Sequence, residues 1–162
     1  MKLIRIDSTA ETPMAAALMA DSAVRPHRKP LFLPAGEWVC EIRPAVRIDR
    51  LGKAIAAKFA SRYYNCVAAV NILRPAPGND VASFEADMMD DAAVVGEWVT
   101  VDGFRTVFDI DRQYVDRVIE ALSANTTLKN GDIIVLPQII QSFAPAIDSH
   151  IKIDNLLDFN IK

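Results

Sequence analysis

The stretch from Asp111 to Pro137 constrains the fold most, because it contains a helix, a turn and a strand with their own start and stop signals. The Asp111 carboxylate can cap a helix by accepting a backbone N–H of the first turn. Apolar residues then recur at helical spacing on one face: Val115, Val118, Ile119 and Leu122. A polar segment, Asn125 to Gly131, leads into the β-branched run Ile133 to Leu136. This pattern predicts an amphipathic helix that covers a core, followed by a strand.

A second constraint is the alternation of apolar and polar residues from Glu37 to Ile48, which predicts a strand with one face in the core. Pro44 lies within this strand and has no N–H, so we expect an edge position or a bulge there. Apolar residues at helical spacing predict a helix from about Arg50 to Tyr64. The apolar run Cys66 to Leu73, interrupted only by Asn71, then predicts a strand that is buried on both faces.

The remaining segments add short elements, mostly strands. We expect a strand at Lys2 to Ile6, a helix from Thr12-Pro13 to about Asp21, and extended, irregular chain from Val24 to Gly36. Further strands are predicted at Val81 to Asp87 and at Trp98 to Val101, and an Asp102-Gly103 hairpin turn then leads into a strand at Arg105 to Phe108. Near the end of the chain, two strands are predicted around Ile151 and Phe159, separated by a turn at Asp154-Asn155. Strands outnumber helices, which indicates a β-rich α+β fold with two main helices.

Composition narrows the function classes. The chain has 162 residues, a formal net charge of -3 and a pI near 5.3, which suit one globular domain and argue against nucleic-acid binding. Cys40 and Cys66 lie in apolar runs without metal-ligand spacing, and we expect buried thiols. No apolar run is long enough for a membrane-spanning helix, and the N-terminal region lacks a signal-peptide pattern, so we expect a cytoplasmic protein without membrane contact.

Several segments together resemble the fumarylacetoacetate hydrolase family. They are "EIRPAVRI", "GKAIAAKFASRYYNCVAAVNI", "MMDDAAVVGEW" and "LSANTTLKNGDIIVLP", in the order and approximate spacing of that family. The resemblance implies a mixed β-sheet roll over residues 29–162, preceded by an N-terminal extension at residues 1–28. It also implies a homodimer and a substrate class of 2-oxo acids or acylpyruvates.

Family members hold magnesium or manganese mainly through a Glu-x-Glu pair and an Asp, since hard divalent cations need several oxygen ligands. Carried over to this sequence, the first Glu falls on Glu41, the second on Arg43, and the Asp on Ile72, with Asn71 beside it. The family's active-site Lys falls near Asp87, and its Thr-Gly-Thr-Pro segment corresponds to residues 136–139. The covering loop that supplies the family's general-base His has no counterpart. We therefore expect no standard active site and no resident metal.

The candidate ligand-binding residues are Glu41, Arg43, Asn71 and Arg47. Arg43 could replace the metal cation and bind a small carboxylate through its guanidinium, but we favour the interpretation that it neutralises Glu41 or another acid. Asn71 is as consistent with a satisfied buried amide as with a ligand contact. Arg47 is more typical of a solvated surface residue.

Three hypotheses follow. The preferred one is a shortened, divergent family member without metal-dependent hydrolase activity, which binds a small carboxylate or has a scaffolding or regulatory role. The second is an active Mg/Mn-dependent hydrolase, decarboxylase or isomerase with a relocated metal site, formed by Glu41 plus Asp87, Asp90 or Asp91. The third is an unrelated protein-interaction domain. A Ser/His/Asp triad from Asp148, Ser149 and His150 is excluded, because adjacent strand residues point to opposite faces.

Overall fold

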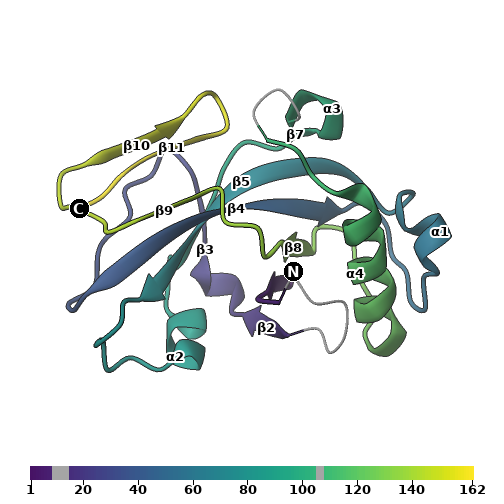
Figure 1. Cartoon of the computed structure of the whole chain (residues 1–162), viewed down its shortest axis with the longest axis horizontal. Coiled ribbons are helices and arrows are strands. Elements are labelled where there is room, and N and C mark those ends of the chain that lie inside the picture. The colour runs from purple at the N-terminus through teal and green to yellow at the C-terminus, as the bar shows by residue number, and fades with distance from the viewer. Residues whose placement is uncertain (9–14, 105–107) are drawn as a thin grey trace.

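The long strands β4 and β5 form the centre of the structure, a computed structural model that describes residues 1–8, 15–104 and 108–162. The strands are β1 (Leu3–Ile6), β2 (Ala16–Met19), β3 (Val24–Pro26), β4 (Trp38–Ile48), β5 (Tyr64–Pro75), β6 (Ala93–Val95), β7 (Val99–Thr100), β8 (Ile133–Val135), β9 (Gln141–Phe143), β10 (His150–Ile153) and β11 (Leu157–Asn160). The helices are η1 (Asp21–Ala23), α1 (Ala57–Ala60), α2 (Ser83–Met88), α3 (Val101–Phe104) and α4 (Arg112–Asn125). These elements surround β4 and β5 (Figure 1).

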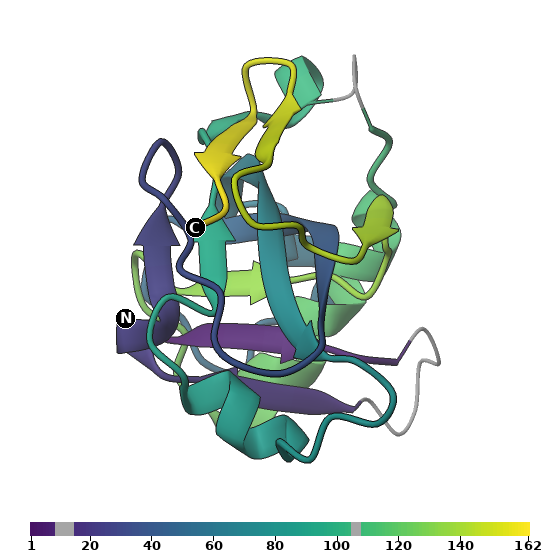
Figure 2. The ribbon, with the colours of Figure 1, turned by 90° about the vertical axis from the view of Figure 1, so that its left-hand side faces the viewer.

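One strongly curved mixed sheet contains most of the strands (Figure 2). Its order is β2-β1-β8-β4-β5-β6-β3, with β7 added to β5 and β9 added to β4. Residues 1–28 supply three of these strands, and β1 lies between β2 and β8. The hairpin β10–β11 forms a separate two-stranded sheet.

The predicted strand at residues 37–48 is confirmed as β4, but Pro44 is not on an outer edge of the sheet. On one side β4 pairs with β5 along its whole length, and on the other it pairs with β8 and β9. The Pro44 carbonyl accepts a hydrogen bond from the Leu136 N–H, so the missing Pro44 N–H faces the gap between β8 and β9. A proline is tolerated there because no ladder partner needs its N–H. The register shift in β4 occurs later, between Arg47 and Ile48.

The two faces of the curved sheet carry two apolar clusters. The larger cluster lies beneath α4 and the hairpin β10–β11, and includes Val115, Ile119 and Phe159. The helix and strand predicted from residues 111–137 are confirmed as α4 and β8, and the Asp111 carboxylate accepts the Tyr114 N–H at 3.1 Å. The smaller cluster lies on the opposite face and includes Ala45, Val70 and Ile72. The strand predicted at residues 66–73 is confirmed as β5.

The helix predicted up to about Asp21 is wrong over its described part, where Ala16–Met19 forms β2. This strand runs antiparallel to β1, with Leu18 opposite Ile4 and the buried Met19 opposite Leu3. Sheet pairing and the burial of Met19 therefore outweigh the helix propensity of the alanines. The expected helix start, Thr12-Pro13, lies outside the described residues.

The helix predicted at residues 50–64 is reduced to the single turn α1. Gly52 and Leu128 exchange both backbone hydrogen bonds, which ties the start of this segment to the loop after α4. Ala54 has a φ of 51°, in the left-handed region, and this conformation cannot continue a right-handed helix. The described residues therefore contain one long helix, α4, instead of the two that were predicted.

Two further local predictions are wrong. The segment predicted as a strand at residues 81–87 contains helix α2, whose first turn is capped by a hydrogen bond from the Ala82 N–H to the Glu85 carboxylate, at 3.2 Å. Asp102-Gly103 lies in helix α3, not in a hairpin turn. The strand expected to follow it falls largely on residues 105–107, outside the described part of the chain. The strand predicted at residues 98–101 corresponds to β7, and the C-terminal strands correspond to β10 and β11.

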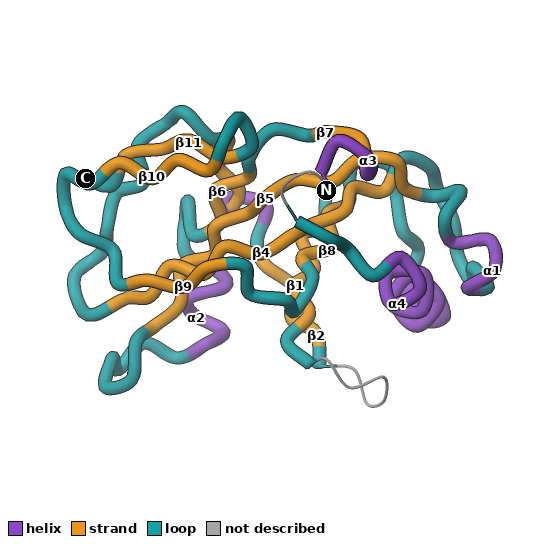
Figure 3. Tube along the Cα trace, turned by 45° about the horizontal axis from the view of Figure 1, so that its top comes forward, coloured by secondary structure: helices purple, strands orange, loops and turns teal. Residues whose placement is uncertain are grey.

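The connections in Figure 3 are mostly loops, and helices are short. α4 has 14 residues, and none of the helices in the described ranges has the length and apolar character required to cross a lipid bilayer.

Candidate functional site

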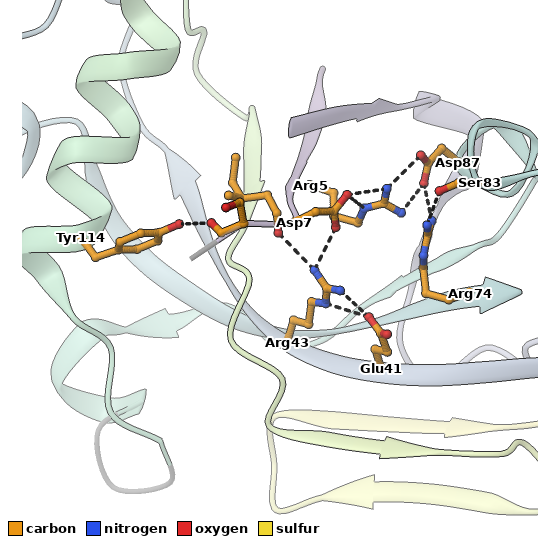
Figure 4. Close-up of polar contacts among 10 residues, drawn as sticks. Arg5, Asp7, Glu41, Arg43, Arg74, Ser83, Asp87 and Tyr114 are labelled. Atoms are coloured by element: carbon orange, nitrogen blue, oxygen red, sulfur yellow. Dashed lines mark hydrogen bonds and ion pairs between the residues drawn. The ribbon is translucent and has the colours of Figure 1, made fainter. Parts of the chain in front are cut away.

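Glu41 and Arg43 point to the same face of β4, as their two-residue spacing predicts, and they contact each other (Figure 4). The Arg43 Nε donates to Glu41 Oε2 at 3.0 Å, and Arg43 Nη2 donates to the same oxygen. Only 8% of the Arg43 side chain and 18% of the Glu41 side chain is exposed. The guanidinium therefore neutralises the one carboxylate that matches the family's Glu-x-Glu pair.

The remaining guanidinium nitrogen of Arg43 faces the end of β1. Arg43 Nη1 donates to the Ile6 carbonyl at 3.1 Å and lies 3.4 Å from Asp7 Oδ1. The other Asp7 oxygen, Oδ2, accepts from Arg5 Nη2 at 2.9 Å and from Arg5 Nε at 3.2 Å. Two guanidinium groups thus hold one carboxylate between them, and 37% of that Asp7 side chain is exposed.

Arg5 continues this chain of contacts into the interior. Its Nη1 lies 2.6 Å from Asp87 Oδ1 and its Nη2 lies 3.2 Å from Asp87 Oδ2, which is a bidentate pair. Arg74 Nη1 contacts the same Asp87 Oδ1 at 2.9 Å, and Arg74 Nη2 donates to Ser83 Oγ. Burial raises the pKa of Asp87, the Arg5 charge opposes that shift, and the Asp7 charge adds to it.

We refer to these six side chains together as the charge network: Glu41, Arg43, Asp7, Arg5, Asp87 and Arg74. Positive and negative groups alternate along it, and its three cations balance its three anions. The residues come from β1 and its end, β4, β5 and α2, which lie far apart in the sequence. Buried charges are tolerated only when they are paired, so each member depends on its neighbours.

Asn71 lies on the other face of the sheet, because it pairs with Ile42 and not with Arg43. It is fully buried, and its Oδ1 and Nδ2 make no hydrogen bond of normal geometry among the described residues, so the weakly polar Cys40 thiol is the one group that interacts with the amide there. Burial raises the pKa of the neighbouring Cys40 thiol to about 11, an increase that the Asn71 side chain partly opposes. Asn71 and Arg43 therefore cannot contact the same ligand from their present positions.

Arg47 shares the face of Arg43 but does not join the charge network. Its guanidinium carbon lies 5.0 Å from the centre of the Trp98 ring, a cation–π contact. The two histidines are also engaged elsewhere: His27 contacts Glu97 at 3.2 Å, and His150 contacts Asp158 at 2.7 Å.

The acidic residues near α2 do not converge on one point. Asp87 belongs to the charge network, Asp91 pairs with Arg25, and Glu85 caps α2. Ile72, at the position of the family's Asp, is buried opposite Glu41 on β5. Within the described ranges, no three His, Cys, Asp or Glu side chains are arranged to hold a metal ion.

Sequence analysis missed Arg5, Asp7 and Arg74 as members of this site. One signal was present: Arg5 is the only charged residue in the otherwise apolar β1 segment "LIRI", and a charge inside a buried strand requires a partner. The partners themselves could not be inferred, because Asp87 is 82 residues away in the sequence.

A small cavity lies beside Tyr114 on α4 and is separate from the charge network. Its volume is about 170 Å³, and it is lined by Asp111, Tyr114, Leu136, Pro137 and Gln138. The Tyr114 hydroxyl donates to the carbonyl of Ser8 at 2.9 Å, and Ser8 follows Asp7 directly (Figure 4). Burial raises the pKa of Tyr114, so this hydroxyl keeps its proton and remains a donor.

Comparison with known proteins gives a clear result for the fold alone. No family model matches the sequence, and no curated protein matches it. Among solved structures, 2-hydroxyhepta-2,4-diene-1,7-dioate isomerase from Mycobacterium marinum has a TM-score of 0.78 at 20% identity, over 99% of this chain and 73% of that one. 5-Carboxymethyl-2-hydroxymuconate delta-isomerase from Mycobacterium smegmatis has a TM-score of 0.79 at 18% identity, over 99% and 78%. A protein assigned to the fumarylacetoacetate hydrolase family from Yersinia pestis CO92 has a TM-score of 0.81 at 17% identity, over 99% and 92%. The curved mixed sheet with few helices is therefore the fold of the fumarylacetoacetate hydrolase family, as the sequence resemblance predicts.

Proposed function

We propose that this chain is a divergent member of the fumarylacetoacetate hydrolase family that has no metal-dependent hydrolase activity. The observation that carries the proposal is the contact between Arg43 and Glu41: a cationic side chain occupies the second carboxylate position and binds the first carboxylate. In this proposal the Arg43 guanidinium, and not a bound metal, supplies the positive charge that neutralises Glu41.

The side chains at this position do not fit a hard divalent cation. Magnesium and manganese require several oxygen ligands, whereas the three positions that match the family's ligands hold Glu41, the cationic Arg43 and the apolar Ile72. The nearby Asp7 carboxylate is already paired with Arg5 and Arg43. A cation that bound Glu41 would have to displace the guanidinium and then lie beside it. Both the lost ion pair and the repulsion between like charges oppose metal binding here.

A thermal-shift titration of metal-stripped protein with magnesium and manganese tests this proposal. We expect no saturable change in melting temperature and no metal retained in elemental analysis. Saturable stabilisation that is lost in Glu41→Ala would overturn the proposal, because a ligand that binds only the folded state raises its stability. That outcome would favour the second hypothesis, a Mg/Mn-dependent enzyme for 2-oxo acids, and would justify assays on acylpyruvates.

A second candidate function, binding of a small carboxylate, is favoured by the position of Asp7. Its carboxylate lies between Arg5 and Arg43, is partly exposed, and is held more loosely by Arg43, at 3.4 Å, than by Arg5. A ligand carboxylate that displaced Asp7 would meet the same two guanidinium groups.

Chemical rescue tests this second function separately from metal binding. Asp7→Ala should lower the melting temperature, and oxalate or pyruvate should restore it in a saturable way, whereas chloride at equal ionic strength should not. Arg43→Met in the Asp7→Ala background is the matched control and should abolish the rescue, because one of the two guanidinium groups is then absent. If no carboxylate has a specific effect, carboxylate binding at this position is refuted, while the proposal of a metal-free site is unaffected.

A further inference from the structure

The two outer edges of the nine-stranded sheet differ in their chemistry. One edge is β3, which has only three residues and contains Arg25 and Pro26. A charged side chain and a missing N–H are both devices that prevent an edge strand from pairing with another chain. The other edge is β2, which contains neither a charged residue nor a proline. In the sequence, the uncharged run extends from Pro13 to Ala20.

The register of β2 shows which of its backbone groups point outward. The Asp7 N–H donates to the Ala15 carbonyl, so residue 15 faces β1, and by alternation residues 17 and 19 do as well. Ala16 and Leu18 therefore direct their N–H and C=O groups away from β1. The Ala20 N–H, which is next in this series, does bond outward, to the Asp87 carbonyl at 3.1 Å. Among the described strands, β2 pairs with β1 alone.

We propose that β2 is the dimer interface of this protein, where it pairs antiparallel with β2 of a second copy. A twofold axis through Ala17 places Ala16 opposite Leu18 of the partner copy, and Leu18 opposite Ala16 of the partner copy. Each of these two pairs exchanges two backbone hydrogen bonds, so the outward N–H and C=O groups of both strands find partners. The strand is self-complementary in this register, and the contact is closed because both copies use the same surface.

Side chains around β2 supply the apolar area that backbone pairing alone lacks. Leu18 is 63% exposed, and in the paired register it packs on Ala16 of the partner copy. Helix α2 contacts the end of β2 and carries two exposed apolar residues, Phe84 and Met88, which are 66% and 65% exposed. Their spacing of four residues places both on one side of the helix. Exposed apolar side chains are thus present both on β2 and on the neighbouring helix α2.

Light scattering and sedimentation over a range of concentrations test the interface. The wild-type protein should have a mass of twice 17.9 kDa, and Leu18→Lys should reduce it to a monomer, because the charge would be buried at the strand pair. Leu51→Lys is the matched control: it makes the same change at a 69% exposed leucine outside β2, and should leave the dimer intact.

A cysteine at the proposed twofold axis gives an independent measurement. In the proposed register, the two copies of residue 17 form a non-hydrogen-bonded pair with Cα atoms about 4.5 Å apart, a separation that a disulfide can span. Ala17→Cys, in a Cys66→Ser background, should therefore form a covalent dimer on mild oxidation without loss of the folded state. A monomer at all concentrations, a dimer that persists in Leu18→Lys, or assemblies that grow beyond the dimer would each overturn the proposal.

Discussion

The buried amide of Asn71 provides the sharpest quantitative prediction. Asn71→Leu keeps the number and branching of the side-chain heavy atoms and replaces two polar atoms by methyl groups. In the folded protein both polar atoms are buried and make no hydrogen bond of normal geometry among the described residues, whereas in the unfolded chain water hydrates them. We therefore expect the substitution to stabilise the fold.

The magnitude follows from the cost of the unsatisfied groups. A buried polar group without a hydrogen bond costs about 1–3 kcal/mol, and the new methyl groups gain transfer free energy that offsets their slightly larger volume. Asn71→Leu should thus raise the free energy of unfolding by about 1–3 kcal/mol. For a chain of this length, each kcal/mol corresponds to a rise in melting temperature of roughly 2–4 °C.

Urea denaturation and calorimetry measure this difference directly. The matched control is Asn65→Leu, the same change at an exposed position of the same strand, which should alter stability by no more than about 0.5 kcal/mol. A loss of more than about 1 kcal/mol in Asn71→Leu would refute the reasoning, because it would mean that the native amide is satisfied by the Cys40 thiol, a bound water or a ligand.

Three further predictions concern the charge network and one glycine. Arg5→Met should lower the free energy of unfolding by about 3–5 kcal/mol in a urea titration, because it leaves the buried Asp87 carboxylate without its bidentate partner. The control Arg50→Met, at the exposed surface, should have little effect in the same measurement. The raised pKa of Asp87 makes the folded protein keep this proton to higher pH than the unfolded chain, where the pKa is 3.8. The stability of wild type relative to Asp87→Asn should therefore fall as the pH rises from 3.8 through the raised pKa, and a rise over that window would show that the Arg5 pairing outweighs burial. Gly96→Ala should prevent stable folding, because a Cβ at this position would lie 2.0 Å from the Leu156 carbonyl oxygen, and the cooperative thermal transition should be lost. Gly78→Ala is the control: no atom lies within 4 Å of the added Cβ, so this variant should fold, with only the modest backbone strain of its positive φ.

Local sequence signals predicted those elements whose own residues determine their structure. Helix α4 has a capping aspartate and an apolar face, and β4 alternates apolar and polar residues over most of its length, so both elements are confirmed. The expected polar face of β4 is nevertheless buried at its centre, where Ala45 lies in the smaller apolar cluster and Arg43 lies against its ion-pair partners. The prediction failed where contacts between distant segments decide. The alanine-rich segment of β2 is extended because β1 pairs with it, and residues 50–56 are not helical because Gly52 bonds to Leu128.

The candidate site shows the same division. The alternation of β4 correctly predicted that Glu41 and Arg43 lie on one face. In the register between β4 and β5, Asn71 lies opposite Ile42, and it therefore lies on the other face of the sheet. The partners of Arg43 at the end of β1 could not be predicted, since no periodicity links Asp7 to a strand 36 residues later. Register and long-range pairing are properties of the folded chain, and a single sequence does not encode them in a local pattern.

The alternating arrangement of the charge network limits how this protein can change by mutation. Replacing Arg43 by a glutamate in one step would bring three carboxylates together, at positions 7, 41 and 43, and would remove the cation that neutralises two of them. Reversal of a single charge is therefore costly unless a neighbour changes with it. Evolution can enter or leave this arrangement only through paired substitutions, and we expect the identities of positions 5, 7, 41, 43, 74 and 87 to covary among homologues as one group.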